Sequence, residues 1–212
     1  MLKINVPFSE KDIVKKLGGM WDPEFKTWYI PRKNYAKLDE FKKWLPFKPS
    51  DEVVILYAPI FLMKTTRVCW RCEKEIEIYG LGNKMINNSI YYHNCDVEQV
   101  DFDNYSNEDY YSKTFGFPIR FVTYITELPS EELSKIIEKS NTYKLKYSNT
   151  VKSKYYANTC PHCNNIQGDY QLYQELDDGF WINYIEKPVE KHVLNDKYDM
   201  ILKGEIMEWL TI

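Results

Sequence analysis

Residues 69–72, Cys-Trp-Arg-Cys, and residues 160–163, Cys-Pro-His-Cys, are two matching stretches that decide how this 212-residue chain folds. Each stretch places two cysteines three positions apart, so one turn can point both sulfur atoms at a single metal ion. Two such pairs supply four thiolates for a tetrahedral site, and Zn²⁺ is the usual occupant in a reducing compartment. The sequence therefore predicts one structural zinc ion, bound by Cys69, Cys72, Cys160 and Cys163.

Two other uses of these cysteines stay open at this point. A local site could combine Cys69 and Cys72 with His93 and Cys95, which would leave the second pair to another role. Redox exchange is the other alternative, although a thioredoxin-like C-x-x-C motif needs a β-α-β setting that the pattern does not show. A site closed by four thiolates has no open position for a substrate, so the predicted zinc ion is structural.

Composition predicts a globular, cytoplasmic protein. Hydrophobic residues make up 44% of the chain, enough for one good core or two small ones. Five cysteines, four of them at metal-binding spacing, suit a reducing cytoplasm better than a disulfide scaffold. We expect no signal peptide, and the longest apolar run, residues 53–63, is too short to cross a membrane.

Charge is distributed unevenly along the chain. The net charge is −3, but residues 1–48 carry eleven Lys or Arg against six Asp or Glu, a net +5 that leaves −8 for the remainder. The whole chain is therefore not expected to attract nucleic acid, whereas its first 48 residues are.

Residues 1–48 are predicted to form a small β-α-β-β-α module. Residues 2–6 alternate apolar and polar side chains, which is typical of a strand. A helix follows and ends at Gly18-Gly19, because glycine adopts the left-handed conformation of a helix C-terminus without a Cβ penalty. Residues 20–30 favour a hairpin, and Asn34 is expected to begin a second helix with Tyr35, Leu38, Phe41 and Leu45 on its buried face.

This module resembles a small domain of unknown function in bacterial and plasmid proteins, including ones related to TraC-type primases and antirestriction proteins. The resemblance is carried by Val6-Pro7-Phe8, Lys11-Asp12, Lys16-Leu17-Gly18, Trp21-Asp22 and the stretch from Lys26 through Trp28-Tyr29-Ile30-Pro31. Gly19-Met20 departs from the Gly-Ala-like pair expected there. A looser likeness links the module to domains attached to DNA-remodelling enzymes. The resemblance implies a nucleic-acid neighbourhood and no catalytic activity.

The two tryptophans of the hairpin have two alternative roles. In a domain this small, at least one of Trp21 and Trp28 is expected to belong to the core. Alternatively, the hairpin displays an aromatic ring beside basic side chains, as proteins that bind single strands do. The candidate nucleic-acid contacts of the module are Trp21, Lys26, Trp28, Tyr29, Arg32 and Lys33.

Residues 53–212, which follow a linker near residues 46–52, are predicted to form a mostly β domain centred on a zinc ribbon. Strands at 64–68 and 75–79 place the first cysteine pair at a hairpin turn. Such a turn favours a positive φ just after the second cysteine, which Asn164 tolerates better than Glu73. Residues 155–170 resemble a zinc-ribbon half of uncharacterised bacterial proteins, in which residues 69–72 have a counterpart, and this supports pairing the two.

A long insertion, at about residues 96–150, separates the cysteine pairs. Its acidic part, residues 96–111, predicts a loop, and a strand at 119–126 and a helix from Pro129-Ser130 follow. Two strands before Cys160 interleave lysines with tyrosines, either as a packed strand with a solvated face or as a groove for a nucleic-acid backbone. The candidate contacts there are Lys144, Lys146, Lys152 and Lys154. Residues 180–185 predict a strand, and residues 196–210 a terminal helix.

The sequence shows no convincing catalytic constellation. An HNH-like nuclease, with His93-Asn94 between the cysteine pairs, would need a second histidine on a following helix. The leading hypothesis is therefore a zinc-stabilised, nucleic-acid-binding accessory protein of the α+β class without catalytic activity. A protein-interaction adaptor of phage, plasmid or immunity type, using the acidic insertion, is the alternative. No small-molecule substrate is evident.

Overall fold

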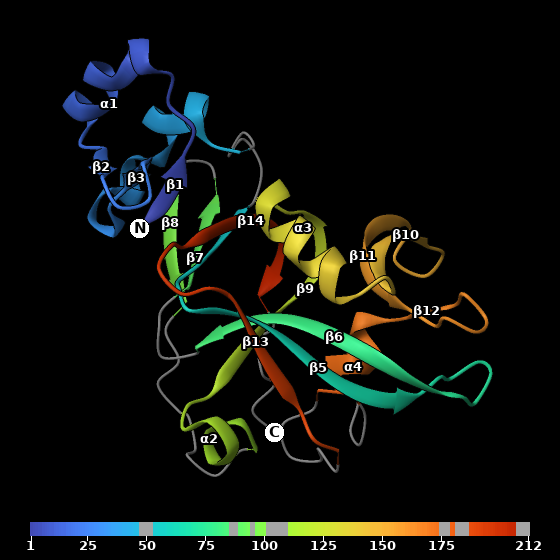
Figure 1. The fold of residues 1–212 in the computed structure, drawn as a ribbon. Coiled ribbons are helices and arrows are strands. Elements are labelled where there is room, and N and C mark those ends of the chain that lie inside the picture. Colours follow the sequence, from blue (N-terminus) through green and yellow to red (C-terminus); the bar gives the residue numbers. More distant parts are fainter. Residues whose placement is uncertain are drawn as a thin grey trace.

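A computed structural model describes residues 1–46, 53–84, 89–93, 96–100, 110–173, 179–180 and 187–206. Its largest feature is an eight-stranded antiparallel sheet in the order β13-β5-β6-β9-β14-β4-β7-β8 (Figure 1). The strands are β4 (Val53–Leu56), β5 (Ile60–Val68), β6 (Glu75–Lys84), β7 (Ser89–His93), β8 (Asp96–Val100), β9 (Ile119–Glu127), β13 (Glu190–Asn195) and β14 (Met200–Ile206). The protein mixes helices with sheets and consists mostly of strands, as the sequence predicts.

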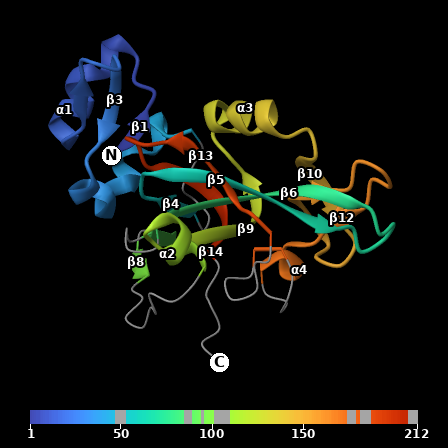
Figure 2. The same cartoon turned by 60° about the horizontal axis from the view of Figure 1, so that its bottom comes forward.

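The sheet is covered on both faces around the long β5–β6 hairpin. Leu62 belongs to the buried cluster that includes Ile136 of α3 (Ser130–Lys139), whereas Phe61 packs with Leu172 of α4 (Asp169–Tyr173). Neighbouring residues of a strand point to opposite faces, so one apolar run serves both clusters. Helix α3 accordingly lies on one side of the hairpin, and α4 and α2 (Tyr110–Phe115) lie on the other (Figures 1 and 2).

Strand β10 (Tyr143–Ser148), which falls within the predicted insertion, forms a second, smaller sheet with the two strands that follow it. This sheet consists of β10, β11 (Ser153–Thr159) and β12 (Ile166–Gln167), in that order. Strand β9 also falls within the predicted insertion, yet it lies between β6 and β14 in the large sheet. This part of the insertion is therefore central to the fold.

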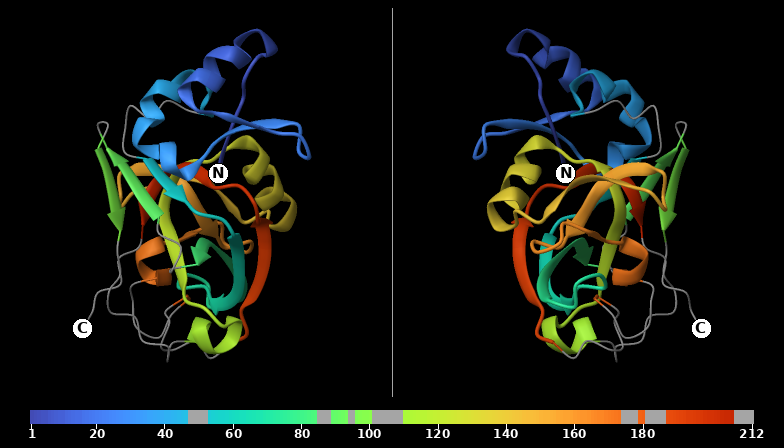
Figure 3. Two further views of the ribbon diagram at one scale, coloured as in Figure 1. Left: turned by 90° about the vertical axis from the view of Figure 1, so that its left-hand side faces the viewer. Right: turned by 90° about the vertical axis from the view of Figure 1, so that its right-hand side faces the viewer.

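The N-terminal module lies at one end of the molecule (Figure 3). It contains β1 (Leu2–Ile4), η1 (Phe8–Glu10), α1 (Lys11–Leu17), β2 (Met20–Asp22), β3 (Thr27–Ile30) and η2 (Arg32–Trp44). Helix α1 ends where predicted, at Gly18 with φ 92°. The second predicted helix is instead a pair of 3₁₀ segments joined at Lys37, whose φ of −111° and ψ of 22° are not helical. Its buried residues Tyr35, Leu38, Phe41 and Trp44 recur every three positions, which matches three residues per 3₁₀ turn better than the α-helical period.

The module packs directly on the large sheet. Its core residues share one buried cluster with Val53 and Ile55 of β4 and with Ile201 of β14. Residues 47–52, where the linker is predicted, lie outside the described residues. The division into residues 1–48 and 53–212 stays a prediction.

Two predictions of secondary structure are wrong. Residues 96–100 form β8, paired with β7, instead of a loop. The predicted terminal helix is wrong because residues 200–206 form strand β14, between β9 and β4. Ile201 packs toward the N-terminal module while Met200 and Leu202 pack toward α3, so burial on both faces outweighs the helical spacing. Residues 181–186, within the strand predicted at 180–185, and residues 207–212 lie outside the described residues.

Candidate metal centre and nucleic-acid surface

The first cysteine pair sits in the turn between β5 and β6, as the sequence predicts. The Cys69 amide donates to the carbonyl of Lys74 at 2.8 Å, and the Glu73 amide donates to the carbonyl of Cys69 at 2.9 Å. Glu73 has φ 59°, the positive value predicted after the second cysteine. The Arg71 amide donates to Cys69 Sγ at 3.4 Å. This turn therefore directs backbone donors at the first sulfur.

The second pair lies between β11 and β12 and repeats this geometry. The Cys160 amide donates to the carbonyl of Asn165 at 2.9 Å, and the Asn164 amide donates to the carbonyl of Cys160 at 2.9 Å. Asn164 also has φ 59°. The His162 amide donates to Cys160 Sγ at 3.4 Å, the counterpart of the Arg71 contact. The two turns thus have the same backbone geometry, although they are built from different residues.

The two turns bring the four sulfur atoms within 4.8 Å of one another. Cys69 Sγ lies 3.7 Å from Cys163 Sγ, and Cys72 Sγ lies 3.6 Å from Cys160 Sγ. A tetrahedral ion with metal–sulfur bonds of about 2.3 Å separates its ligands by about 3.8 Å, so the cluster has the size of such a site. Cys69 and Cys160 are buried, and Gln167 Nε2 donates to Cys69 Sγ at 3.4 Å.

The pKa values of these thiols are also consistent with a bound cation. The Asn165 side-chain and backbone amides lower the pKa of Cys163 to about 6. The backbone amide of Lys74 acts the same way on Cys72, but burial and the neighbouring sulfurs outweigh it and raise the pKa of Cys72 to about 12. Thiolates this close repel one another, and only a positive ion among them stabilises all four. The cluster is therefore suited to a metal ion.

The alternative ligands do not gain support from the described residues. Cys95 lies outside them, and His93 ends β7. The sulfurs of Cys160 and Cys163 instead adjoin those of the first pair. The remaining histidines are on separate elements, with His162 exposed in the second turn and His192 on β13.

The tryptophan hairpin of the module divides its aromatic rings between core and surface. Trp28 is 8% exposed and belongs to the core, so one of the two tryptophans is structural, as expected. Trp21 is 46% exposed, and its ring centroid lies 5.6 Å from that of Trp28. Tyr29 is half-buried, and Lys26 is exposed with φ 49° at the turn.

The hairpin turn is held against the body of the protein. Tyr198 Oη donates to Asp22 Oδ2 at 2.6 Å, and Lys197 Nζ forms an ion pair with the same carboxylate at 2.9 Å. These two groups hold the pKa of Asp22 well below its usual range. The Phe25 and Tyr198 rings pack nearly perpendicular to each other, with centroids 5.7 Å apart. The turn is therefore fixed in place while Trp21 stays accessible.

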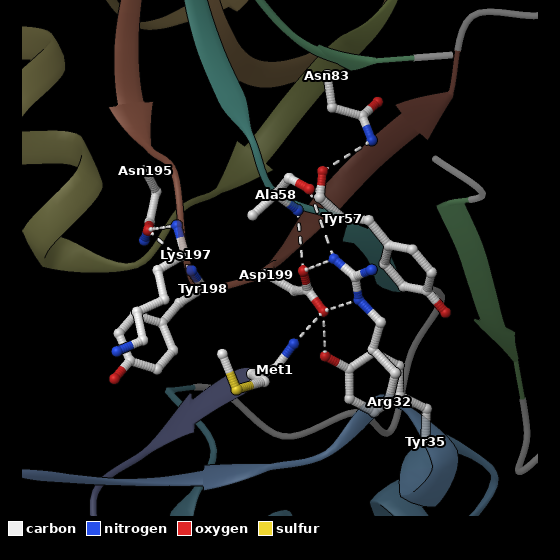
Figure 4. A network of polar contacts seen from close by, with 10 residues as sticks. All are labelled: Met1, Arg32, Tyr35, Tyr57, Ala58, Asn83, Asn195, Lys197, Tyr198 and Asp199. Atoms are coloured by element: carbon white, nitrogen blue, oxygen red, sulfur yellow. Dashed lines mark hydrogen bonds and ion pairs between the residues drawn. The ribbon is translucent and has the colours of Figure 1, made fainter. Parts of the chain in front are cut away.

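Arg32 occupies a structural position that the sequence did not predict. Its guanidinium donates to both carboxylate oxygens of Asp199, at 2.8 and 2.6 Å (Figure 4). The Tyr35 hydroxyl, the Ala58 amide and the Met1 amino group also donate to this carboxylate. Asp199 has no exposed side-chain surface. The module is thus anchored to the sheet by a buried carboxylate, and Lys33, the next residue after Arg32, is exposed.

The lysines before the second cysteine pair lie on the β10–β11 hairpin. Lys144, Lys152 and Lys154 are exposed and Lys146 is half-buried. Tyr155 is buried, with its ring centroid 5.4 Å from that of Tyr124. The hairpin therefore combines a packed tyrosine with accessible lysines, and either predicted role is compatible with this arrangement.

The chain is thus a mixed α and β protein with a four-cysteine cluster that can hold a metal ion and an N-terminal segment that packs on the large sheet. Residues 1–46 match the family described as "Domain of unknown function (DUF5710)". A stretch of 43 residues is 49% identical to "DNA primase TraC" of Escherichia coli. This match covers 19% of the chain and 4% of the primase, so it concerns a small part of both proteins. No solved structure matches the chain. Within the described residues, no helix is long and apolar enough to span a membrane.

Proposed function

We propose that this chain is a zinc-stabilised accessory protein that binds nucleic acid through its N-terminal module and has no catalytic activity of its own. The observation that carries the proposal is the net charge of +5 on this module, and the 43-residue likeness of the chain to part of a DNA primase supports it. The four-cysteine centre is proposed to hold one Zn²⁺ and to stabilise residues 53–212.

The charges of the module support a phosphate-binding surface. Five exposed lysines form no ion pair with another described residue, namely Lys15, Lys16, Lys26, Lys33 and Lys37. Asn34 Nδ2 donates to the carbonyl of Gly18 at 2.9 Å, which brings the end of α1 next to the start of η2. The end of α1, which carries Lys15 and Lys16, therefore lies beside the start of η2, which carries Lys33. Clustered, unpaired lysines attract phosphates without selecting a sequence.

Binding should be measured with single-stranded DNA, duplex DNA and RNA at several salt concentrations. The variant Lys15→Gln/Lys33→Gln should weaken binding to every sequence and reduce the slope of log affinity against log salt by about 1–2, because each lost phosphate contact contributes about 0.7–0.9. The matched control is Lys74→Gln/Lys139→Gln, which removes the same charge from exposed positions outside the module. Equal effects of both variants, or no binding by the unchanged protein, would contradict the proposal.

A protein-interaction adaptor is the second candidate, and exposed apolar side chains of the module favour it. Phe8 is 81% exposed and Ile13 is 53% exposed. Apolar side chains presented at a surface are typical of protein interfaces. If the module binds no nucleic acid, and Phe8→Ser/Ile13→Ser abolishes copurification of one defined protein with the full chain, the adaptor replaces our proposal.

A further inference from the structure

An open cleft of about 660 Å³ lies beside the four-cysteine centre. Residues from both cysteine turns and from the turn of the β10–β11 hairpin line it. Three of its aromatic side chains are about half exposed, namely Trp70 at 50%, Tyr147 at 51% and Tyr170 at 55%. The cleft falls within the usual size range of small-ligand sites, about 300–1,000 Å³.

Trp70 is held in a fixed orientation even though half of its surface is accessible. Its Nε1 donates to the carbonyl of Ile166 at 2.7 Å. Trp70 lies between the two cysteines of the first pair, and Ile166 follows the second pair. A metal ion that joins the two turns therefore also fixes one aromatic wall of the cleft. A ring fixed in advance loses little conformational entropy when a flat ligand stacks on it.

Hydrogen-bond donors and acceptors line the cleft between the aromatic rings. The floor includes Asp169, which is 4% exposed and accepts a hydrogen bond from the Tyr124 amide at 2.7 Å. Burial raises the pKa of the Asp169 carboxyl group to about 7, although the Tyr124 amide opposes this shift. Near neutral pH, Asp169 can therefore donate or accept a proton in a hydrogen bond. The amides of Asn164 and Gln171 supply further donors and acceptors.

Positive charge is placed at one side of the same cleft. Lys146 lines it and is directly opposite Tyr155, a buried residue of the same lining, in the β10–β11 register. Residues opposite each other in antiparallel strands share a face, so Lys146 and Tyr155 are neighbours. Aromatic rings beside lysines are the combination with which proteins hold the bases and phosphates of single strands.

We propose that this cleft binds one unpaired nucleobase of a single-stranded nucleic acid, with Trp70, Tyr147 and Tyr170 stacking on the base and Lys146 contacting a neighbouring phosphate. The inference rests on the proposed function and extends it, because it adds base recognition at a second site to phosphate binding by the module. Aromatic cages also bind methylated amines. Lys146 would repel such a cation, and a partly neutral Asp169 attracts it weakly, so the base is the better fit.

The test compares a single-stranded DNA with an abasic strand of the same length, which keeps the phosphates and lacks the bases. The unchanged full chain, loaded with zinc, should bind the base-bearing strand about tenfold or more tightly than the abasic strand. The reason is that one base stacked on aromatic side chains contributes about this factor to the affinity, and the abasic strand has no base to stack. Tyr147→Ala/Tyr170→Ala should remove this preference and leave binding to the abasic strand unchanged. Tyr147→Phe/Tyr170→Phe keeps the rings and should keep the preference.

The same experiment separates this inference from the proposed function. Lys15→Gln/Lys33→Gln should weaken binding to both strands by the same factor. Equal affinity of the unchanged chain for both strands would overturn the cleft inference and leave the proposed function standing. No binding to either strand would overturn both. Calorimetric titration with tetramethylammonium chloride and with thymidine 5′-monophosphate adds a direct comparison, in which heat from tetramethylammonium alone would identify an amine site and overturn the inference.

Discussion

The N-terminal module and the four-cysteine region are both small, and they are stabilised in different ways. The module shares an apolar core with β4 and β14 and is fixed by one buried carboxylate, Asp199. The four-cysteine region joins two turns whose sulfurs lie 3.6–3.7 Å apart. A core of side chains is stable without added ligand, whereas four adjacent thiolates need a cation. Metal removal should therefore affect one region and leave the other largely intact.

The largest effect is expected from Cys160→Ser. The variant should lose its zinc and unfold the four-cysteine region, because zinc binding to four ligands contributes about 10–16 kcal/mol in small peptides. Metal analysis should show one zinc per unchanged chain and none in the variant, and amide hydrogen exchange should rise in β11 and β12 more than in the module. His162→Ala is the matched control, since this exposed side chain lies in the same turn and should leave zinc in place.

The same metal analysis tests the local alternative site. Loss of zinc in Cys95→Ser, with zinc kept in Cys160→Ser, would assign the ion to the first pair with His93 and Cys95 and contradict the four-cysteine centre.

A smaller effect, confined to the module, is expected from Asp199→Asn. The change leaves Arg32 and the Met1 amino group without a counter-charge, and breaking a buried ion pair costs about 3–5 kcal/mol. Because Arg32 is 43% exposed and can reach water, we expect Asp199→Asn to lower the free energy of unfolding by about 3 kcal/mol, the lower end of that range. Urea unfolding checks this value. The control is Glu131→Gln, which breaks the exposed ion pairs of Glu131 with Lys3 of the module and with Lys135 of α3 and should cost about 1 kcal/mol or less.

The difference in stability between the unchanged chain and Asp199→Asn should depend on pH, because it follows the ionisation of Asp199. Burial alone would raise the pKa of Asp199, but Arg32, the Met1 amino group and Tyr35 outweigh burial and hold it below its usual value. The folded state therefore favours the ionised form. Its contribution to stability is complete above the unfolded pKa, near 3.9, and is lost as the pH falls through the lower folded pKa. The stabilities of the unchanged chain and Asp199→Asn should converge below about pH 4, and a constant difference would contradict the ion-pair account.

The sequence predicted the four-cysteine cluster better than it predicted the anchor of the module, for a physical reason. Ligand spacing is local, so each cysteine pair reveals its turn, and the positive φ after the second cysteine occurs at both Glu73 and Asn164. Asp199 lies 167 positions from Arg32, and no local pattern connects them. Strand β14 was not predicted for the same reason. Its burial on both faces depends on contacts with the module and with α3, which are distant in the sequence.

The smallest effect distinguishes the two cysteine turns from each other. Both place a residue at φ 59°, but Glu73 tolerates this left-handed conformation less well than Asn164, at a cost of about 1 kcal/mol. Glu73→Asn should therefore stabilise the zinc-loaded chain by about 0.5–1 kcal/mol in urea unfolding, and Asn164→Ala should destabilise it by a similar amount. Glu73→Ala removes the carboxylate and keeps the Cβ atom, so it should bring no gain. If Glu73→Ala stabilised the chain as much as Glu73→Asn, the benefit would come from the lost charge, and the two turns would not differ in backbone strain.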